Sequence, residues 1–142
     1  MGSNNTANGT ISLLRNGTGQ SNVALGFAAG QFNSSGSNNV MIGSDAGSYH
    51  PGEGTLNDAE DSIYIGANSR GFSNADQNSI VIGTSAVGEG ANTTVIGTAA
   101  TTKTHLHGTT ETGGLVVEGQ SRLKGQVILD QPQGDISMGI YQ

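Results

Sequence analysis

Two histidines, His105 and His107, are the residues whose type and spacing come closest to a chemical site. Residues two apart on an extended strand point to the same side, so both imidazoles would share one face. Imidazole is a good ligand for iron, zinc and nickel, and the pair therefore predicts a transition-metal site if further ligands converge there. The alternative is that Leu106 between them takes the protein interior, as apolar residues usually do, and that both histidines face water.

A second group of polar residues surrounds the stretch from residue 47 to 60. Its members are Asp45, Tyr49, His50, Glu53, Asp58, Glu60 and Asp61. Calcium needs clustered oxygen ligands, but this spacing matches neither an EF-hand nor a glycine-rich calcium repeat, and a solvated acidic loop is the plainer interpretation. Because recognition residues are often found on loops held by a rigid scaffold, we expect the stretch to contact a receptor. The expected contact residues are Tyr49, His50, Glu53 and Asp58.

Composition argues against several classes of function. The 142 residues carry 5 Lys and Arg against 11 Asp and Glu, a net charge of −6, and they form no basic cluster that would hold a nucleic acid. No run approaches the ~18 apolar residues of a membrane span, so we expect no membrane insertion. There is no cysteine, no Gly-x-Ser-x-Gly elbow, no phosphate-binding loop and no zinc-protease motif. We therefore expect no enzymatic activity.

A repeat organises the first hundred residues. One small polar residue, three mostly apolar or β-prone residues and a glycine recur five times, at residues 22–26, 39–43, 62–66, 79–83 and 93–97. A small residue also follows each glycine by three positions, as Ala29, Ala46, Ser69, Ala86 and Ala100. Recurrence of this kind indicates stacked structural units. Residues 10–13 look like a degraded sixth copy that lacks the glycine, as terminal units of repeat arrays often do.

Each copy is predicted to form one coil of an all-β parallel solenoid. Three β-prone residues bounded by Asn or Ser and by Gly are typical of a short strand, and the Gly- and Ser-rich segments between copies are typical of turns. Equivalent strands stacked at ~4.8 Å would pair in register. The repeat glycines are separated by 17, 23, 17 and 14 residues. The longest interval therefore accommodates an inserted loop between about residues 47 and 60.

Alternation along each strand assigns two apolar columns to opposite faces. The first and third apolar residues of a copy, such as Val23 and Leu25, are expected to line the interior of the coil. The middle residue would then face outward, in an uncharged column that implies a partner surface. Burial of this column between subunits would offset the entropy that so thin a roll loses on folding. The expected interface residues are Met41, Tyr64, Val81 and Val95.

The pattern changes from residue 113 onward. Apolar or small residues occupy every second position from 115 to 129, and charged residues occupy several of the positions between them. Because such a stretch does not bury its apolar face alone, we expect three copies to wind into a β-prism-like stalk. The chain is thus divided into an N-terminal cap or linker (1–20), a β-roll head (21–101) and a trimeric β-strand stalk (102–142).

Residues 21–101 resemble the head repeats of trimeric autotransporter adhesins (YadA-like heads), whose motif runs roughly Asn-Ser-Val-Ala-Ile-Gly-x-x-Ser/Ala. They are also similar to β-roll segments of phage tail fibres, especially those that carry endosialidase-type intramolecular chaperones. The resemblance implies a left-handed parallel β-roll with three intertwined chains about a common axis. The 23-residue interval departs from the shorter period of the family, and a typical autotransporter neck, coiled-coil stalk and membrane anchor are absent. The phage-fibre and secreted-fibre interpretations therefore both stay open.

The resemblance also implies a role and a location. It suggests a structural or adhesive fibre subunit that attaches to a cell-surface protein or glycan, outside the cell, on a bacterial surface or a phage virion. Three chains would bring six imidazoles from His105 and His107 together, and similar His-x-His pairs in phage fibre tips hold an octahedral iron; Fe, Zn or Ni would suit this ring. Two alternatives are a pure trimerisation or spacer module and a fragment of a glycan-cleaving tailspike, which would need paired carboxylates in a groove.

Overall fold

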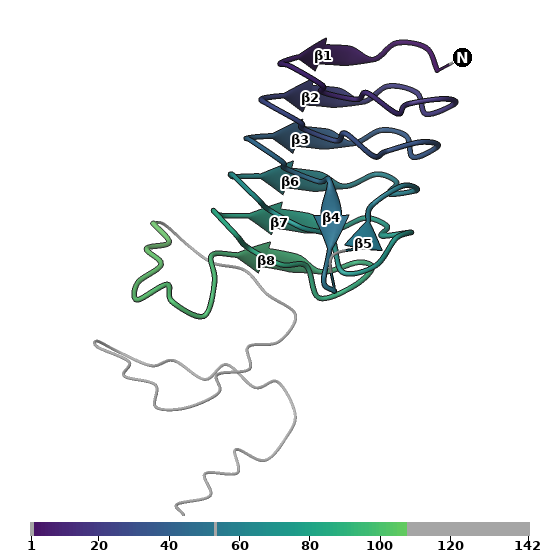
Figure 1. Cartoon of the computed structure of the whole chain (residues 1–142). Coiled ribbons are helices and arrows are strands. Elements are labelled where there is room, and N and C mark those ends of the chain that lie inside the picture. The colour runs from purple at the N-terminus through teal and green to yellow at the C-terminus, as the bar shows by residue number, and fades with distance from the viewer. Residues whose placement is uncertain (1, 53, 108–142) are drawn as a thin grey trace, which may run out of the picture. The chain divides into compact units, whose positions relative to one another are not determined.

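Residues 2–52 and 54–107 are described by the computed structural model of the chain, and they form a stack of short parallel strands (Figure 1). One six-stranded sheet has the order β1-β2-β3-β6-β7-β8. Its strands are β1 (Thr6–Asn8), β2 (Val23–Leu25), β3 (Val40–Ile42), β6 (Ile63–Ile65), β7 (Ile80–Ile82) and β8 (Thr94–Ile96). The prediction of an all-β parallel solenoid is confirmed. Its left-handed sense stays a prediction, and residues 108–142 of the expected stalk lie outside the described part.

The strands pair in register, as the repeat predicts. Val40 pairs with Val23 on one side and with Ile63 on the other, so equivalent residues form columns along the stack. The repeat glycines form one such column, and they adopt φ values between 90° and 146° that favour glycine. A Cβ atom on Gly43 would also lie 2.7 Å from the carbonyl carbon of Gly66 in the next coil. Glycine is therefore required at this corner by conformation and by close approach.

The sixth coil lies earlier in the chain than predicted. Strand β1 pairs in register with β2, and Gly9 occupies the position of the repeat glycine with a φ of 146°. Residues 10–13, predicted to be the degraded copy, form the turn that follows. The prediction was wrong because β1 consists of Thr6, Ala7 and Asn8 and carries no large aliphatic side chain. Residues 2–20, expected to be a cap or linker, form the first coil of a compact unit that ends at Thr104.

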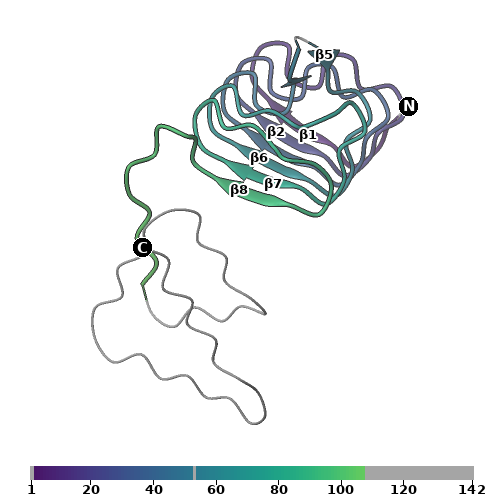
Figure 2. The ribbon, with the colours of Figure 1, turned by 90° about the horizontal axis from the view of Figure 1, so that it is seen from below.

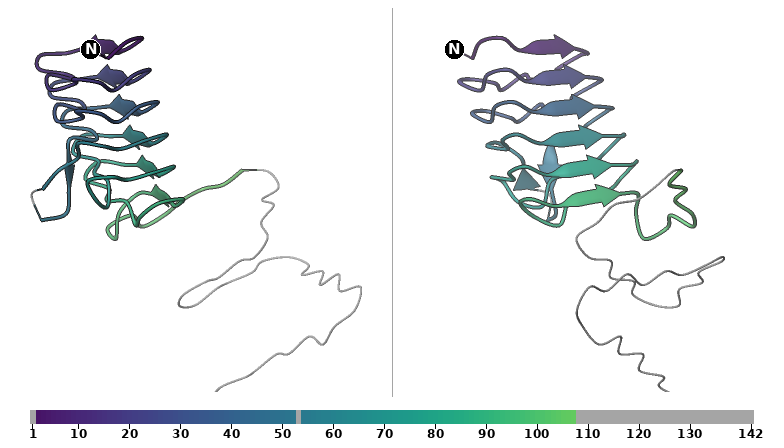
Figure 3. Two further views of the ribbon diagram at one scale, coloured as in Figure 1. Left: turned by 90° about the vertical axis from the view of Figure 1, so that its right-hand side faces the viewer. Right: turned by 180° about the vertical axis from the view of Figure 1, so that it is seen from behind.

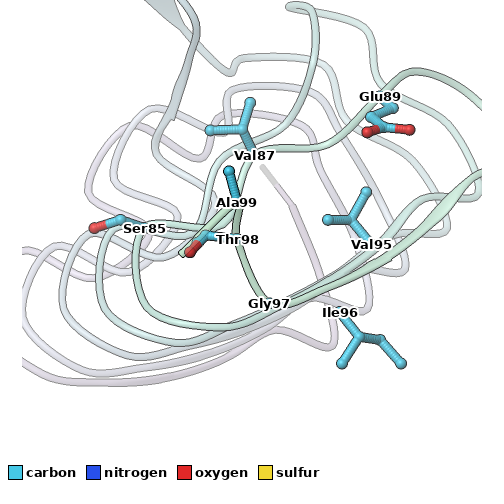
Figure 4. A pocket seen from close by; sticks show the side chains of 8 residues that line it. All are labelled: Ser85, Val87, Glu89, Val95, Ile96, Gly97, Thr98 and Ala99. Carbon is cyan, nitrogen blue, oxygen red and sulfur yellow. The ribbon is translucent and has the colours of Figure 1, made fainter. Parts of the chain in front are cut away.

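The structure reverses the predicted faces of the strands. The middle residues of four strands lie inside the coils with at most 1% of their surface exposed: Ala24, Met41, Tyr64 and Val81. Flanking residues face outward instead, and the best exposed are Val23 at 39%, Leu25 at 46% and Ile96 at 56%. Figure 4 shows the same arrangement in the last coil, where Val95 points into the coil and Ile96 points away from it. Three of the four expected interface residues are thus core residues of a single chain, and Val95 is half-buried.

Coil width explains the reversal. The small residues three positions after the repeat glycines face the middle column from across the coil and are fully buried: Ala29, Ala46, Ser69 and Ala86. Glycines complete the space around the largest interior side chains. A Cβ atom on Gly30 would lie 2.6 Å from Met41 Sδ, and one on Gly47 would lie 2.7 Å from Met41 Cγ. So narrow a coil admits one large side chain per strand, and the face with two aliphatic residues has to turn outward.

A ladder of polar side chains explains the first position of the repeat. The Oδ1 atom of each asparagine accepts a hydrogen bond from the backbone N–H of the equivalent residue one coil further on. The bonds run from Asn22 N–H to Asn5 at 2.9 Å, from Asn39 N–H to Asn22 at 3.0 Å and from Ser62 N–H to Asn39 at 3.0 Å. Ser62 Oγ continues the ladder by accepting from Ser79 N–H at 3.1 Å. The ladder satisfies backbone donors inside the coils, which would be costly to leave unpaired.

Candidate functional site

The outward side of the six-stranded sheet carries an unusual concentration of apolar residues. We call it the outer aliphatic face and define it by Val23, Leu25, Val40, Ile42, Ile63, Ile65, Ile80, Ile82 and Ile96. These are nine of the ten flanking positions on β2, β3, β6, β7 and β8; the tenth is Thr94. All nine are half-buried or exposed, and none is charged. Parallel sheets are normally covered on both faces. An uncovered sheet face that consists of aliphatic side chains is typical of an interaction surface.

A hairpin projects from the side of the coils that lies away from the sheet (Figure 2). It consists of β4 (Tyr49–His50) and β5 (Gly54–Thr55), which pair antiparallel. Figure 3 shows the hairpin running along the direction in which the coils are stacked, roughly perpendicular to the strands of the six-stranded sheet. The predicted insertion is therefore confirmed. Its base is firmly anchored, because Leu56 is fully buried and its N–H donates to the Ser48 carbonyl at 3.0 Å.

The structure separates the residues that were expected to contact a receptor. Tyr49 and His50 stand together on β4, where the His50 ring covers Gly54 so closely that a Cβ atom there would clash with it. Asp58 accepts hydrogen bonds from Ser35 Oγ and from Asn74 Nδ2, and so links neighbouring coils. Glu53 lies outside the described residues. The hairpin is thus a surface feature, whereas the carboxylate of Asp58 is engaged in the structure of the roll.

An arrangement of arginines and aromatic rings beside the hairpin was missed by the sequence analysis. The guanidinium carbon of Arg15 lies 5.1 Å from the centre of the Phe32 ring. The Phe32 and Tyr49 rings are 5.3 Å apart and inclined by 60°, and the guanidinium carbon of Arg70 lies 5.9 Å from the Tyr49 ring. We call these four residues the arginine–aromatic strip. A signal was available, because Arg15, Phe32 and Tyr49 are each 17 residues apart, which is the dominant spacing of the repeat.

His105 and His107 follow the roll in an exposed segment. Their rings are inclined by only 17°, with centres 6.3 Å apart, an arrangement that agrees with two side chains on the same side of an extended chain. Leu106 between them is 70% exposed. No group of three or more potential ligands of the His, Cys, Asp and Glu types gathers within residues 2–52 and 54–107. The histidine metal site therefore stays a prediction that depends on other copies of the chain.

One buried carboxylate, Asp76, lies inside the roll. Tyr64 Oη donates a hydrogen bond to Asp76 Oδ2 at 3.0 Å, and the Phe72 N–H donates to the same oxygen at 3.3 Å. Burial raises the pKa of Tyr64 well above its usual value, and the negative charge of Asp76 raises it further. Both side chains are at most 1% exposed. A ligand at the protein surface cannot reach them, so we assign this pair to the core.

The last coil leaves an open cavity of about 290 Å³ between Val87 and Val95 (Figure 4). Glu89 is the one carboxylate among its lining residues. Hydrolysis of glycosides normally uses two carboxyl groups on either side of the bond to be cleaved. This cavity therefore lacks the pair that a glycan-cleaving site would need.

Comparison of the chain with family models, with curated proteins and with solved structures gives no match. No helix in the described part of the chain is long and apolar enough to cross a membrane. Two surfaces on opposite sides of the roll are the candidates for function: the outer aliphatic face and the side that bears the hairpin.

Proposed function

We propose that the chain is a subunit of a homotrimeric extracellular fibre with a structural and adhesive role and no catalytic one. The outer aliphatic face is the observation that carries the proposal. Three copies would pack these faces against each other about a common axis, in place of the middle-residue column that the sequence suggested. Full burial of a Val, Leu or Ile side chain contributes ~1.5–3 kcal/mol, and the face offers nine such side chains per chain.

The shape of the face favours identical partners. It repeats at the strand spacing, so another copy in the same orientation presents ridges with the same period. It is also narrow, because three residues at ~3.3 Å each make a strip roughly 10 Å wide. Three narrow strips can close about one axis with every copy equivalent, and closed symmetry of this kind is usual for homo-oligomers. The resemblance to the heads of trimeric fibres also supports an assembly of three copies.

The position of the hairpin supports the adhesive part of the proposal. It lies on the side of the coils away from the sheet, so it would stay exposed when the outer aliphatic faces are buried. Self-association and contact with a cell-surface protein or glycan would therefore not compete for the same surface. An extracellular place, on a bacterial surface or a phage virion, follows from the resemblance and belongs to the proposal.

A matched pair of aspartates in neighbouring coils tests the assembly. Leu25→Asp would bring three negative charges together within the proposed interface, and we expect it to yield folded monomers in sedimentation velocity. Thr18→Asp adds the same charge at an exposed turn whose side chain makes no hydrogen bond within the described residues, and we expect it to leave the assembly unchanged. Equal sedimentation of both variants and the unmodified chain would contradict the proposed interface.

A second experiment separates adhesion from spacing. A variant in which residues 50–54 are replaced by a two-residue Asn-Gly turn should keep the roll, because Leu56 and its contacts are retained. We expect it to keep the mass of the assembly and to lose attachment to cells that bind the unmodified fibre. Undiminished attachment would show that residues 50–54 do not contact the receptor, whereas failure of the unmodified fibre to attach to cells would favour the spacer function.

A further inference from the structure

We propose that the arginine–aromatic strip is a binding site for an acidic polysaccharide, a sugar chain that bears carboxylate or sulfate groups. The inference deepens the proposed adhesive function and rests on it for its biological setting. Its members come from four successive coils, and they follow one another as arginine, ring, ring, arginine. At the ~4.8 Å spacing of stacked strands, the strip spans roughly 14 Å. A surface of this length fits several sugars rather than one.

The two guanidiniums supply the anion-binding chemistry. The guanidinium carbon of each lies over an aromatic ring, a cation–π contact that restricts the side chain without using its N–H donors. Within residues 2–52 and 54–107 neither Arg15 nor Arg70 donates a side-chain hydrogen bond or lies within 4.0 Å of a carboxylate. A planar guanidinium with unused donors binds carboxylate or sulfate with two parallel hydrogen bonds. The strip thus places two such binding groups at its two ends.

The rings between the arginines supply a surface for the sugars. Phe32 and Tyr49 are both half-buried, so part of each ring stays accessible to solvent beside the guanidinium that lies over one of its faces. The C–H bonds on the face of a sugar ring carry a small positive charge and pack well on the electron-rich face of an aromatic ring. The backbone beneath is fixed by bonds between coils, including Arg15 N–H to the Gln31 carbonyl at 3.0 Å and Gly71 N–H to the Tyr49 carbonyl at 3.2 Å. The backbone that carries the strip is therefore held in place by the roll itself.

Charge and backbone pairing argue against the other polyanions. The strip holds two arginines on a chain whose net charge is −6, which is too little positive charge to track a duplex nucleic acid with a phosphate every ~1.7 Å. An acidic peptide would gain most by adding a strand to an open sheet edge. The backbone at Arg15 and Tyr49 already bonds to neighbouring coils, so the strip offers side chains rather than such an edge.

Binding of defined polymers to the full chain tests the inference. Polygalacturonate provides carboxylates, heparin provides sulfates, dextran is a neutral sugar chain and poly-glutamate is an acidic peptide. We expect polygalacturonate or heparin to bind, with the stronger of the two identifying the acidic group, and we expect neither dextran nor poly-glutamate to do so. Failure of both acidic polysaccharides to bind, or equally strong binding of poly-glutamate, would overturn the proposal.

Three variants locate the site. Arg15→Gln and Arg70→Gln together should weaken polysaccharide binding by roughly tenfold for each guanidinium removed. Lys103→Gln removes the same charge from an exposed residue outside the strip and should change binding by less than about twofold. Arg15→Lys with Arg70→Lys keeps the charge but loses the planar group, and it should also bind weakly. Full binding by the lysine variant, or equal losses in the Lys103 control, would contradict a shaped site.

The inference and the proposed function can fail separately. A fibre that attaches to cells but binds no acidic polysaccharide would overturn the strip as a glycan site and leave the adhesive function standing. A monomeric chain that binds polysaccharide, and loses it in the arginine variants, would support the strip and contradict the fibre.

Discussion

The inward and outward faces of the same short strands differ in the sizes of their side chains and in what packs against them. Inside the coils the residues differ in size from strand to strand, from Ala24 to Tyr64, and each is matched by glycines or small residues of its own chain. On the outer aliphatic face the residues are nearly uniform, and no described part of the chain is shaped to them. The contrast shows that the interior is filled by side chains of one chain, and it supports the proposal that the outer aliphatic face packs against other copies.

Adjacent residues of β7 allow the sharpest test of this difference. Val81 is fully buried and Ile82 is 36% exposed. Val81→Asp would bury an unpaired charge, and we expect it to cost more than ~4 kcal/mol and to unfold the chain. Ile82→Asp should leave the coils folded and prevent association. Circular dichroism and sedimentation of the two variants check this, and a folded Val81→Asp chain would show that the column is not the core.

The asparagine ladder should contribute the next largest effect. Asn39→Ala leaves two buried backbone groups without partners, because Asn39 Oδ1 accepts from Ser62 N–H at 3.0 Å and Nδ2 donates to the Ala59 carbonyl at 2.6 Å. We expect the free energy of unfolding in urea to fall by ~2–4 kcal/mol. Gln20→Ala, at an exposed position, should change it by less than ~0.5 kcal/mol. Similar losses of unfolding free energy in both variants would show that the asparagine ladder contributes no more to stability than an exposed side chain does.

A smaller effect, with a dependence on pH, is expected from the interior tyrosine. Tyr64→Phe removes a hydrogen bond to Asp76 and should cost ~1–3 kcal/mol near neutral pH. Because burial raises the pKa of Tyr64, the folded chain keeps this proton above pH ~10 while the unfolded chain releases it. Stability should therefore fall by ~1.4 kcal/mol for each further pH unit. Urea unfolding between pH 9 and 11 should show this slope in the unmodified chain, and a slope that persists in Tyr64→Phe would refute the assignment.

The histidine pair should have the smallest effect on the fold. If three chains converge beyond the roll, His105 and His107 would hold one transition metal through six imidazoles. Elemental analysis of protein purified without a histidine tag should then find about one metal ion per three chains, and none in His107→Ala. Both proteins should unfold at the same urea concentration if the roll is independent of the metal. Metal-free unmodified protein would leave both histidines as surface residues.

Much of the roll could be predicted because its repeat is marked by glycines. The spacing of Gly26, Gly43 and Gly66 indicated the coils, their register and the insertion. The faces could not be assigned in the same way, because they depend on the width of the coil. The number of aliphatic residues predicts that the first and third residues of each strand face the interior. The narrow interior instead holds the single middle residue of a strand, opposite small residues such as Ala46. The polar strand of β1 was misplaced because it keeps Gly9 but lacks the apolar signal.

The candidate sites were harder to predict than the fold. The inserted hairpin was predicted from the 23-residue interval between two repeat glycines, and Tyr49 and His50 do lie on it. The arginine–aromatic strip joins residues that are unremarkable one by one and become neighbours through the 17-residue period that separates Arg15 from Phe32. Asp58 was taken for a loop residue because a sequence does not show that Ser35 and Asn74 lie beside its carboxylate. The expected stalk beyond residue 107 stays a prediction.

The mass of the unmodified chain in solution tests the central claim most directly. If the outer aliphatic faces pack against each other about a threefold axis, light scattering should report about three times the 14.3 kDa of the chain, and this mass should persist on dilution. A folded chain that scatters as a single 14.3 kDa particle at all concentrations would contradict the account. The outer aliphatic face would then be exposed to solvent in the folded chain.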